Sequence, residues 1–276
     1  MRASITISPL GGLANRMRAI LSARALATDA GATLKVLWNV CSELGCEPQW
    51  LFNTEYWDFE WETTSPTSHH WLWKPGGKSN LYIPRLWQSL LFAKQIHDHT
   101  LLGNKFTQET ILKAADKRLY ITSGLCFYPY NSSDAAKLFS PTQSITDMAN
   151  KNLSMMQGCN KVGVHIRRTD NSQSIKHSPD HLFSSMIRQQ IFQKPDTMFY
   201  LATDSTDVKN KLIKEFGGRI VTSHEEACRS SQQGIINAWA EMLTLSRMNL
   251  IIGSFYSSFS EMAAQIGNTP LIMATK

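Results

Sequence analysis

The stretch VGVHIRRTD, from Val162 to Asp170, is a short apolar run that changes abruptly into charged residues. It is followed by a helical pattern over Pro179 to Phe192, as expected for a buried strand and its crossover helix in a parallel sheet. Five such apolar runs alternate with helix-like segments between Lys161 and Ala274. This alternation predicts an α/β domain with a doubly wound parallel sheet.

The other predicted elements of this half continue the alternation of strands and helices. The other strands expected are Met198 to Ala202, Arg219 to Val221, Leu250 to Ile252, and Leu271 to Met273. The other helices expected are Thr206 to Phe216, Ile236 to Arg247, and Ser257 to Ile266. Ligands of doubly wound sheets bind beyond the carboxyl ends of the strands, so the residues that follow each strand are the candidates for function.

The first half opens with a strand at Ile5 to Ser8, a Gly11-Gly12 turn and an amphipathic helix. A second strand at Thr33 to Trp38 completes a β-α-β unit, because parallel pairing requires a crossover of this kind. From Cys41 to Ile111 the pattern weakens and we expect irregular structure, with one more strand at Arg118 to Thr122. Two Rossmann-like domains, residues 1-150 and 151-276, are therefore predicted, the first irregular, with a linker near residues 146–160.

Composition and net charge limit the classes of function that fit this sequence. The chain has 276 residues, 42% of them hydrophobic, and a net charge of +6 that suits an anionic ligand such as a nucleotide diphosphate. The basic residues are scattered along the chain, which argues against a nucleic-acid-binding function.

The sequence contains no run of about 18 apolar residues that would indicate a membrane span. We therefore expect a cytoplasmic protein, with a peripheral membrane location as the second option. Five cysteines without a CxxC pair predict free buried thiols rather than a zinc site or disulfide framework.

Three predicted strand ends carry polar groups suited to one anionic nucleotide. In the first, strand alternation puts His165 and Arg167 on one face and Arg168 on the other. Guanidinium groups bind phosphate oxygens in a bidentate manner, so a diphosphate is a suitable partner for this buried charge. A salt bridge to Asp170 that only closes the strand end is the alternative.

The other two strand ends are open to two interpretations each. Asp204 either meets the ligand or caps the next helix. Ser254, Ser257 and Ser258 follow a strand and a glycine, so they either bind a phosphate or cap a helix. On the preceding helix, the carboxylate of Glu241 is able to accept hydrogen bonds from guanine N1 and N2, although an exposed surface glutamate is the simpler interpretation.

Four stretches resemble the fucosyltransferase superfamily, whose members have the two-domain glycosyltransferase-B (GT-B) fold and include α-1,6-, α-1,2- and protein O-fucosyltransferases. They are GGLANRMRAI at Gly11 to Ile20, VGVHIRRTD at Val162 to Asp170, YLATD at Tyr200 to Asp204, and LSRMNLIIGSFYSSFSEMA at Leu245 to Ala263. Their order and spacing match the family's pattern across both halves of the chain.

The resemblance implies roles for individual residues. Arg167 matches the arginine that grips the β-phosphate of GDP-fucose, and His165 matches a histidine near the nucleoside. Glu241 falls where the family reads guanine with an aspartate, and Ser257 falls on a phosphate-binding serine. The complete expected donor-binding set is Gly12, Asn15, Arg16, His165, Arg168, Asp204, Glu241, Ser254, Ser257 and Ser258.

The resemblance also implies an inverting, metal-independent transfer of fucose to a glycan or other hydroxyl, with the first domain on the acceptor side. No cofactor is expected beyond the GDP-sugar substrate, and a bacterial surface polysaccharide is the pathway that family habit suggests. The family has a glutamate a few residues beyond the His-x-Arg-Arg motif, and this glutamate has no counterpart here. Asp170 is the nearest carboxylate and is the candidate base. The predicted catalytic residues are therefore Arg167 and Asp170.

Two other functions remain open: a transferase for another nucleotide sugar, and a binding protein that has lost catalysis. A dinucleotide-binding oxidoreductase is disfavoured because the Gly11-Gly12 turn lacks GxGxxG spacing. The tryptophans of the irregular region either stack an acceptor sugar or pack in the core; they are Trp57, Trp61, Trp71, Trp73 and Trp87. Neither the acceptor nor the oligomeric state follows from the sequence.

Overall fold

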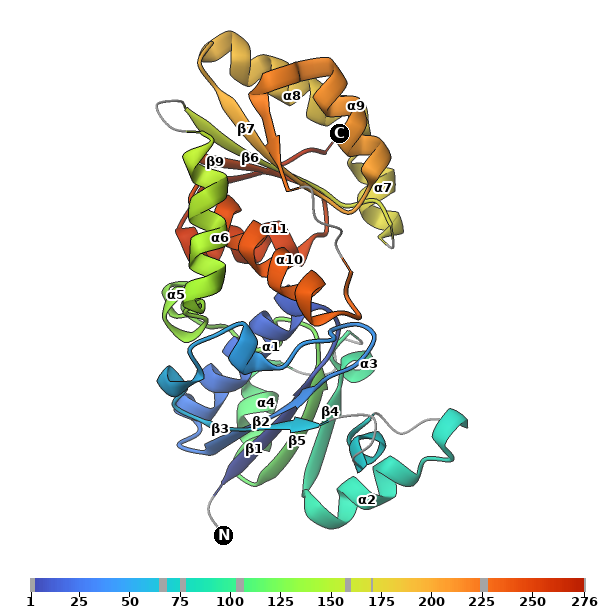
Figure 1. Cartoon of the computed structure of the whole chain (residues 1–276). Helices are drawn as coiled ribbons and strands as arrows, with labels where there is room; N and C mark the ends of the chain where they lie inside the picture. The colour runs from blue at the N-terminus through green and yellow to red at the C-terminus, as the bar shows by residue number, and fades with distance from the viewer. Residues whose placement is uncertain are drawn as a thin grey trace. The chain divides into compact units, whose positions relative to one another are not determined.

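The computed structural model describes residues 3–64, 69–74, 78–102, 107–156, 160–169, 171–223 and 228–275, with only the backbone at 69 and 70. The chain divides into two compact units. Unit 1 comprises Met1–Ser140 and Arg229–Gln232, and unit 2 comprises Pro141–Cys228 and Gln233–Lys276. Each unit is built on its own parallel sheet (Figure 1).

Unit 1 has a five-stranded parallel sheet in the order β3-β2-β1-β5-β4. Its strands are β1 (Ser4–Pro9), β2 (Thr33–Asn39), β3 (Glu60–Thr64), β4 (Lys94–His97) and β5 (Arg118–Ser123). Its helices are α1 (Leu13–Asp29), α2 (Ile83–Leu91), α3 (Asp98–Leu101), α4 (Gln108–Ala114) and α5 (Ser133–Leu138). Short 3-10 turns are η1 (Pro48–Trp50), η2 (Thr54–Tyr56), η3 (His69–Trp73) and η4 (Lys78–Asn80).

Unit 2 has a second five-stranded parallel sheet in the order β10-β9-β6-β7-β8. Its strands are β6 (Lys161–Ile166), β7 (Met198–Thr203), β8 (Ile220–Thr222), β9 (Leu250–Gly253) and β10 (Leu271–Met273). Its helices are α6 (Gln143–Ser154), α7 (Ser172–His177), α8 (Asp180–Gln193), α9 (Thr206–Phe216), α10 (Gln232–Leu245) and α11 (Ser258–Gly267), with the 3-10 turn η5 (Gly217–Arg219).

Alternation along β6 sorts its side chains onto the two faces of the unit 2 sheet. Val162, Val164 and Ile166 enter a buried cluster with residues of α8 and α9. His165 lies on the opposite face, where α10 and α11 pack (Figure 1). Gly163 shares that face, and a Cβ there would lie 2.7 Å from a side-chain carbon of Leu245 on α10, so a larger residue would require that side chain to move. Helices thus cover both faces of the sheet, as doubly wound sheets require.

The structure confirms the predicted α/β class and all five predicted strands of the second half. Two predictions were wrong. The region expected to be irregular, residues 41–111, contains β3, β4 and α2, and the expected linker at 146–160 is largely helix α6. Both missed strands are short and form the edges of the sheet, and β3 reads EWETT, so neither carries the apolar run of a central strand.

Within the described residues, no helix combines the length and apolar character that a bilayer crossing requires. The expectation of buried thiols was wrong for most of the described cysteines: among these, only Cys46 is buried, whereas Cys126 and Cys228 are exposed and Cys41 is partly exposed. Cys159 lies outside the described residues.

Candidate functional site

The strand order of unit 2 creates a topological switch point beside β6. From β6 the chain adds β7 and β8 on one side, and then returns to add β9 and β10 on the other. Open α/β sheets bind ligands in the crevice at this reversal, beyond the carboxyl ends of the two strands. His165 pairs in register with Gly253 of β9, so the residues that follow these two strands are neighbours. Two of the three strand ends singled out from the sequence therefore meet at one place.

Ser254 ties the ends of β6 and β9 together. Its hydroxyl accepts a hydrogen bond from the backbone amide of Arg167 at 3.0 Å and donates one to the carbonyl of His165 at 3.2 Å. Its side chain is completely buried. Whether Ser254 contacts a donor remains a prediction, but its observed bonds are those of a residue that positions Arg167.

The side chain of Arg167 forms an ion pair with Asp204, the residue after β7. Its Nη1 lies 2.9 Å from Oδ2 of Asp204, and the two side chains are 17% and 11% exposed. Asp204 also accepts hydrogen bonds from the backbone amide of Arg168 at 2.7 Å and the hydroxyl of Thr169 at 2.7 Å. Burial alone would raise the pKa of Asp204, but the Thr169 hydrogen bond and the Arg167 charge outweigh it and the pKa is lowered. Arg167 is therefore held at the strand end by an ionised carboxylate.

The structure does not support the alternative that Asp204 caps the next helix. The N-cap of α9 is Ser205, whose hydroxyl accepts a hydrogen bond from the backbone amide of Val208. Asp204 is thus available to position the guanidinium of Arg167.

The third strand end presents the start of helix α11. Ser257 is the N-cap, yet its side chain makes no capping hydrogen bond, and its hydroxyl lies 3.4 Å from Nδ1 of His165. Ser258, the first helical residue, is partly exposed. Backbone amides at a helix start attract anions, because they point outward at the positive end of the helix dipole. Ser257 therefore does not cap α11 through its side chain, and phosphate binding at this helix start remains a prediction.

His165 is a neutral, stacked residue rather than a charged one. Its ring lies on that of Phe259, with centroids 4.7 Å apart and planes inclined by 23°. Burial, and next the charge of Arg167, lower the pKa of His165 to about 3. The imidazole therefore offers a hydrogen-bonding nitrogen and a flat surface, without charge, at physiological pH.

Arg168 binds the segment that leads into α8, and its Nη1 also donates to the carbonyl of Arg167 at 2.8 Å. Its Nε and Nη2 donate to Asp180 at 2.9 and 2.7 Å, and the same Nη2 donates to the carbonyl of Ser178 at 2.8 Å. Its guanidinium also lies over the ring of Phe183. A donor contact by Arg168 remains a prediction, and the described bonds make it a structural support. Its partner Asp180 was not anticipated, since an acidic residue in a first helical turn normally indicates capping.

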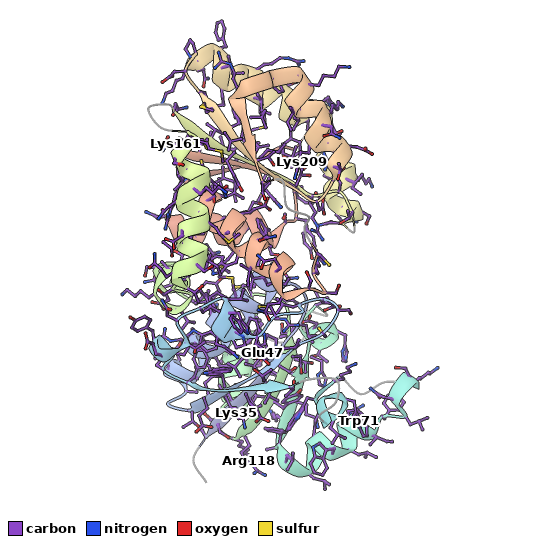
Figure 2. All side chains as sticks on the ribbon, viewed as in Figure 1. Lys35, Glu47, Trp71, Arg118, Lys161 and Lys209 are labelled. Atoms are coloured by element: carbon purple, nitrogen blue, oxygen red, sulfur yellow. The ribbon has the colours of Figure 1, made fainter. Side chains whose placement is uncertain are left out.

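Glu241 on α10 interacts electrostatically with β7 and α9. Burial raises the pKa of its carboxyl group to about 7, and the nearby charge of Lys209 opposes that rise. Lys209, labelled in Figure 2, lies in the first turns of α9 and donates to the carbonyl of Ser223 at 2.7 Å. The charge of Glu241 also helps to raise the pKa of Tyr200. A carboxyl group that titrates near neutrality is a frequent mark of a functional position.

The unit 1 candidates surround the turn after β1. Gly11 adopts a φ of +78°, which favours glycine, and Gly12 is the N-cap of α1. A Cβ at Gly12 would meet no atom within 4 Å, and Asn15 is partly exposed. Arg16 is only 1% exposed: its Nε donates to the carbonyl of Gly11 at 2.9 Å and its guanidinium lies over the ring of Trp38. Arg16 therefore supports the turn that precedes α1, and a donor contact by Arg16 remains a prediction.

Asp170, the predicted base, lies outside the described residues. In the part of the chain that is described, no group of three or more His, Cys, Asp or Glu side chains is arranged to hold a metal ion.

Comparisons with known proteins add a fold assignment. No protein-family model matches the chain, and no curated protein matches it. Solved structures do match. The NodZ α-1,6-fucosyltransferase soaked with GDP-fucose aligns with a TM-score of 0.62 at 14% identity, over 99% of this chain and 95% of that one. The chain has the fold of a fucosyltransferase.

Two further structures agree. POFUT1 in complex with GDP-fucose aligns with a TM-score of 0.57 at 13% identity, over 99% of this chain and 97% of that one. A variant of Arabidopsis thaliana FUT1 in complex with GDP aligns with a TM-score of 0.62 at 14% identity, over 99% of this chain and 70% of that one. The similarity to these fucosyltransferases spans both sheets, as the predicted two-domain architecture requires.

Proposed function

We propose that this chain transfers fucose from GDP-fucose to a hydroxyl group of a glycan acceptor. Unit 2 is the donor-binding domain and unit 1 is the acceptor side. The observation that carries the proposal is the arrangement at the switch point of unit 2. There the Arg167–Asp204 pair follows β6, and the start of α11, at which Ser257 makes no side-chain capping bond, follows β9. The fold shared with enzymes crystallised with GDP or GDP-fucose supports the same function.

The proposed donor contacts follow from the chemistry of a nucleoside diphosphate. The guanidinium of Arg167 and the first amides of α11 supply positive charge for the two phosphates. Ser257 and Ser258 supply hydroxyl donors beside them, and His165 supplies a neutral surface and a ring nitrogen. Glu241 accepts hydrogen bonds from the guanine N1 and N2 groups when its carboxyl group is ionised.

In the proposed reaction, the acceptor oxygen attacks the anomeric carbon of fucose from the face opposite the phosphate. The bond between that carbon and the β-phosphate oxygen breaks, and its electron pair leaves with GDP. Arg167 stabilises the developing phosphate charge electrostatically, and Asp204 fixes the direction of the guanidinium. The acceptor proton passes to a base, for which Asp170 remains the predicted residue. Because protein groups supply the positive charge, we propose a metal-independent, inverting reaction.

Calorimetric titration with GDP, UDP and ADP tests the donor assignment. The wild type is expected to bind GDP in preference to the other two, and Arg167→Ala is expected to lose that binding. Arg188→Ala is the matched control, because Arg188 is an arginine of unit 2 whose 65%-exposed side chain pairs with Glu215 away from the switch point. Equal or absent binding of all three nucleotides by the folded wild type would overturn the proposal.

An acceptor screen with GDP-fucose then tests transfer itself. Bacterial surface-polysaccharide fragments come first, since this is the pathway that we propose. Transfer that persists in the presence of EDTA is expected, and a requirement for divalent metal would contradict the metal-independent mechanism. GDP binding without transfer to any acceptor would instead favour a nucleotide-sugar-binding protein.

A further inference from the structure

Helix α2 of unit 1 carries a large apolar surface that faces outward. The exposed fractions are 76% for Leu81, 44% for Tyr82, 43% for Ile83, 66% for Leu86, 41% for Trp87 and 76% for Leu90. We call these six residues the α2 patch. Scattered exposed apolar residues are ordinary, but a contiguous group of this size marks a surface that contacts something else.

Helix α2 buries few of its residues. Its buried residues are Pro84 and Gln88, and the Gln88 amide donates to the carbonyls of Leu72 and Lys74 at 2.8 and 2.9 Å. Ile83, Leu86 and Leu90 fall at i, i+3 and i+7, which aligns them on a different face of the helix. The apolar stripe is therefore not a core-facing stripe of unit 1.

The backbone at the start of α2 has an unusual conformation. Leu81 and Tyr82 both adopt left-handed backbone conformations, with φ values of 52° and 57°. Bulky residues rarely occupy this region, and consecutive ones indicate a local conformation held against its own preference. Here that conformation accompanies two exposed apolar side chains at the entrance to α2. Trp71, on η3 next to α2, is also 41% exposed (Figure 2).

The charged side chains of the sequence segment that carries the patch have one sign. From residue 65 to residue 97 the sequence contains no Asp or Glu. The same segment contains Lys74, Lys78, Arg85 and Lys94, and all four are exposed. Leucine, tryptophan and tyrosine beside basic residues are the composition of helices that lie in the interface of a bilayer, where anionic headgroups attract the basic side chains.

We propose that the α2 patch docks unit 1 onto the surface of an anionic lipid bilayer, with α2 lying in the interfacial region. The leucine and aromatic side chains enter the headgroup boundary, and the four basic residues contact the anionic headgroups. Charge complementarity distinguishes this occupant from a second copy of the chain, which would bring the same basic residues against one another. This inference is independent of the proposed transferase activity.

Sedimentation with lipid vesicles tests the proposal. The wild type is expected to bind vesicles of phosphatidylcholine mixed with phosphatidylglycerol, and to bind vesicles of phosphatidylcholine alone at least tenfold more weakly. The double substitution Leu86→Ser with Leu90→Ser is expected to reduce binding to the mixed vesicles at least tenfold. Phe192→Ser is the matched control, because Phe192 is 89% exposed on α8 of unit 2 and should leave vesicle binding unchanged.

A charge variant tests the basic residues separately from the apolar residues of the α2 patch. Arg85→Glu with Lys94→Glu is expected to weaken binding to the anionic vesicles and to leave the weak binding to neutral vesicles unaltered. GDP titration of every variant reports whether unit 2 is intact and distinguishes failure of this proposal from failure of the transferase proposal.

Three outcomes would overturn the inference. One is a wild type that does not bind the mixed vesicles. Another is equal binding by the wild type and the double leucine variant. The third is a wild-type dimer in light scattering that the double leucine substitution dissociates, without vesicle binding, which would make the patch an interface between copies of the chain.

Discussion

In each sheet an arginine follows the central strand, Arg16 in the first turns of α1 and Arg167 directly after β6, and the two arginines differ in their surroundings. Arg16, after β1, is 1% exposed and contacts the Gly11 carbonyl and the Trp38 ring. Arg167, after β6, retains 17% of its side-chain exposure and pairs with the ionised Asp204. Arg16 also donates to the Cys41 sulfur at 3.2 Å, so the partners described for it are carbonyls, a thiol and a ring.

The difference separates an arginine that supports a turn from one that we propose to bind a ligand. A buried guanidinium whose donors all end on backbone and core groups holds a turn in place, whereas one that remains partly exposed on a carboxylate keeps a surface for an anion. Burial lowers the pKa of Arg16, as expected of a charge held within unit 1. The comparison predicts that substitution of Arg167 lowers activity and that substitution of Arg16 lowers the stability of unit 1.

The largest expected effect is on transfer rate. Arg167→Ala is expected to lower kcat by about 10²- to 10³-fold, the loss typical when one donor to a developing oxyanion is removed. Arg167→Lys should recover only part of that loss, because an ammonium group keeps the charge but not the planar donor geometry. Steady-state kinetics with GDP-fucose measure both. Full activity in Arg167→Ala would remove the basis of the comparison.

The next effect is on the stability of unit 1. Arg16→Met is expected to destabilise it by about 3 kcal/mol, because buried carbonyl acceptors lose a charged donor. Seven of the eight tryptophans belong to unit 1, so tryptophan fluorescence during urea unfolding mainly follows that unit. GDP affinity should be preserved under conditions where the variant is folded. A stable variant that fails to bind GDP would instead give Arg16 a direct role.

A pH effect of intermediate size is expected from Glu241. Its pKa is raised to about 7, so the carboxyl group gains a proton as the pH falls through 7. If guanine requires the ionised form, GDP affinity should fall by up to about tenfold for each pH unit below 7. UDP binding should lack this dependence. Calorimetry of the wild type and Glu241→Gln between pH 5.5 and 8.5 measures it, and an equal slope in the variant would contradict the assignment.

The same shift has a consequence for stability. A carboxyl group with a raised folded-state pKa favours folding below its ordinary pKa, and that contribution is lost as the pH rises through 7. Glu241→Gln should therefore become more stable relative to the wild type between pH 5 and pH 8, as thermal unfolding across this range would report.

The smallest expected effect is that of Gly12→Ala. Gly12 has an ordinary φ of −74° and a Cβ there would meet nothing within 4 Å, so we expect a stability change below about 0.5 kcal/mol. A fall in transfer without a fall in thermal stability would show that substrate approaches this turn. Unchanged kinetics would confine the Gly11-Gly12 turn to a structural role, as the burial of Arg16 suggests.

Sequence patterns predicted unit 2 well for a specific reason. Its five strands are short apolar runs separated by helices of ordinary length, and the predicted α9 matches the observed one from Thr206 to Phe216. Unit 1 was predicted less completely, because β3 and β4 are polar edge strands stabilised by pairing with a neighbour rather than by their own apolar pattern.

The sequence by itself determined the α/β class, the strand ends that carry polar residues, and the four stretches that resemble fucosyltransferases. Those are local properties of composition and spacing. Tertiary structure decided which polar residues serve which purpose: Asp204 pairs with Arg167 while Ser205 caps α9. Ser254 bonds to the backbone of His165 and Arg167, whereas the hydroxyl of Ser257 lies beside the ring of His165. These outcomes depend on strand order and on partners up to 92 residues away, which no local pattern encodes.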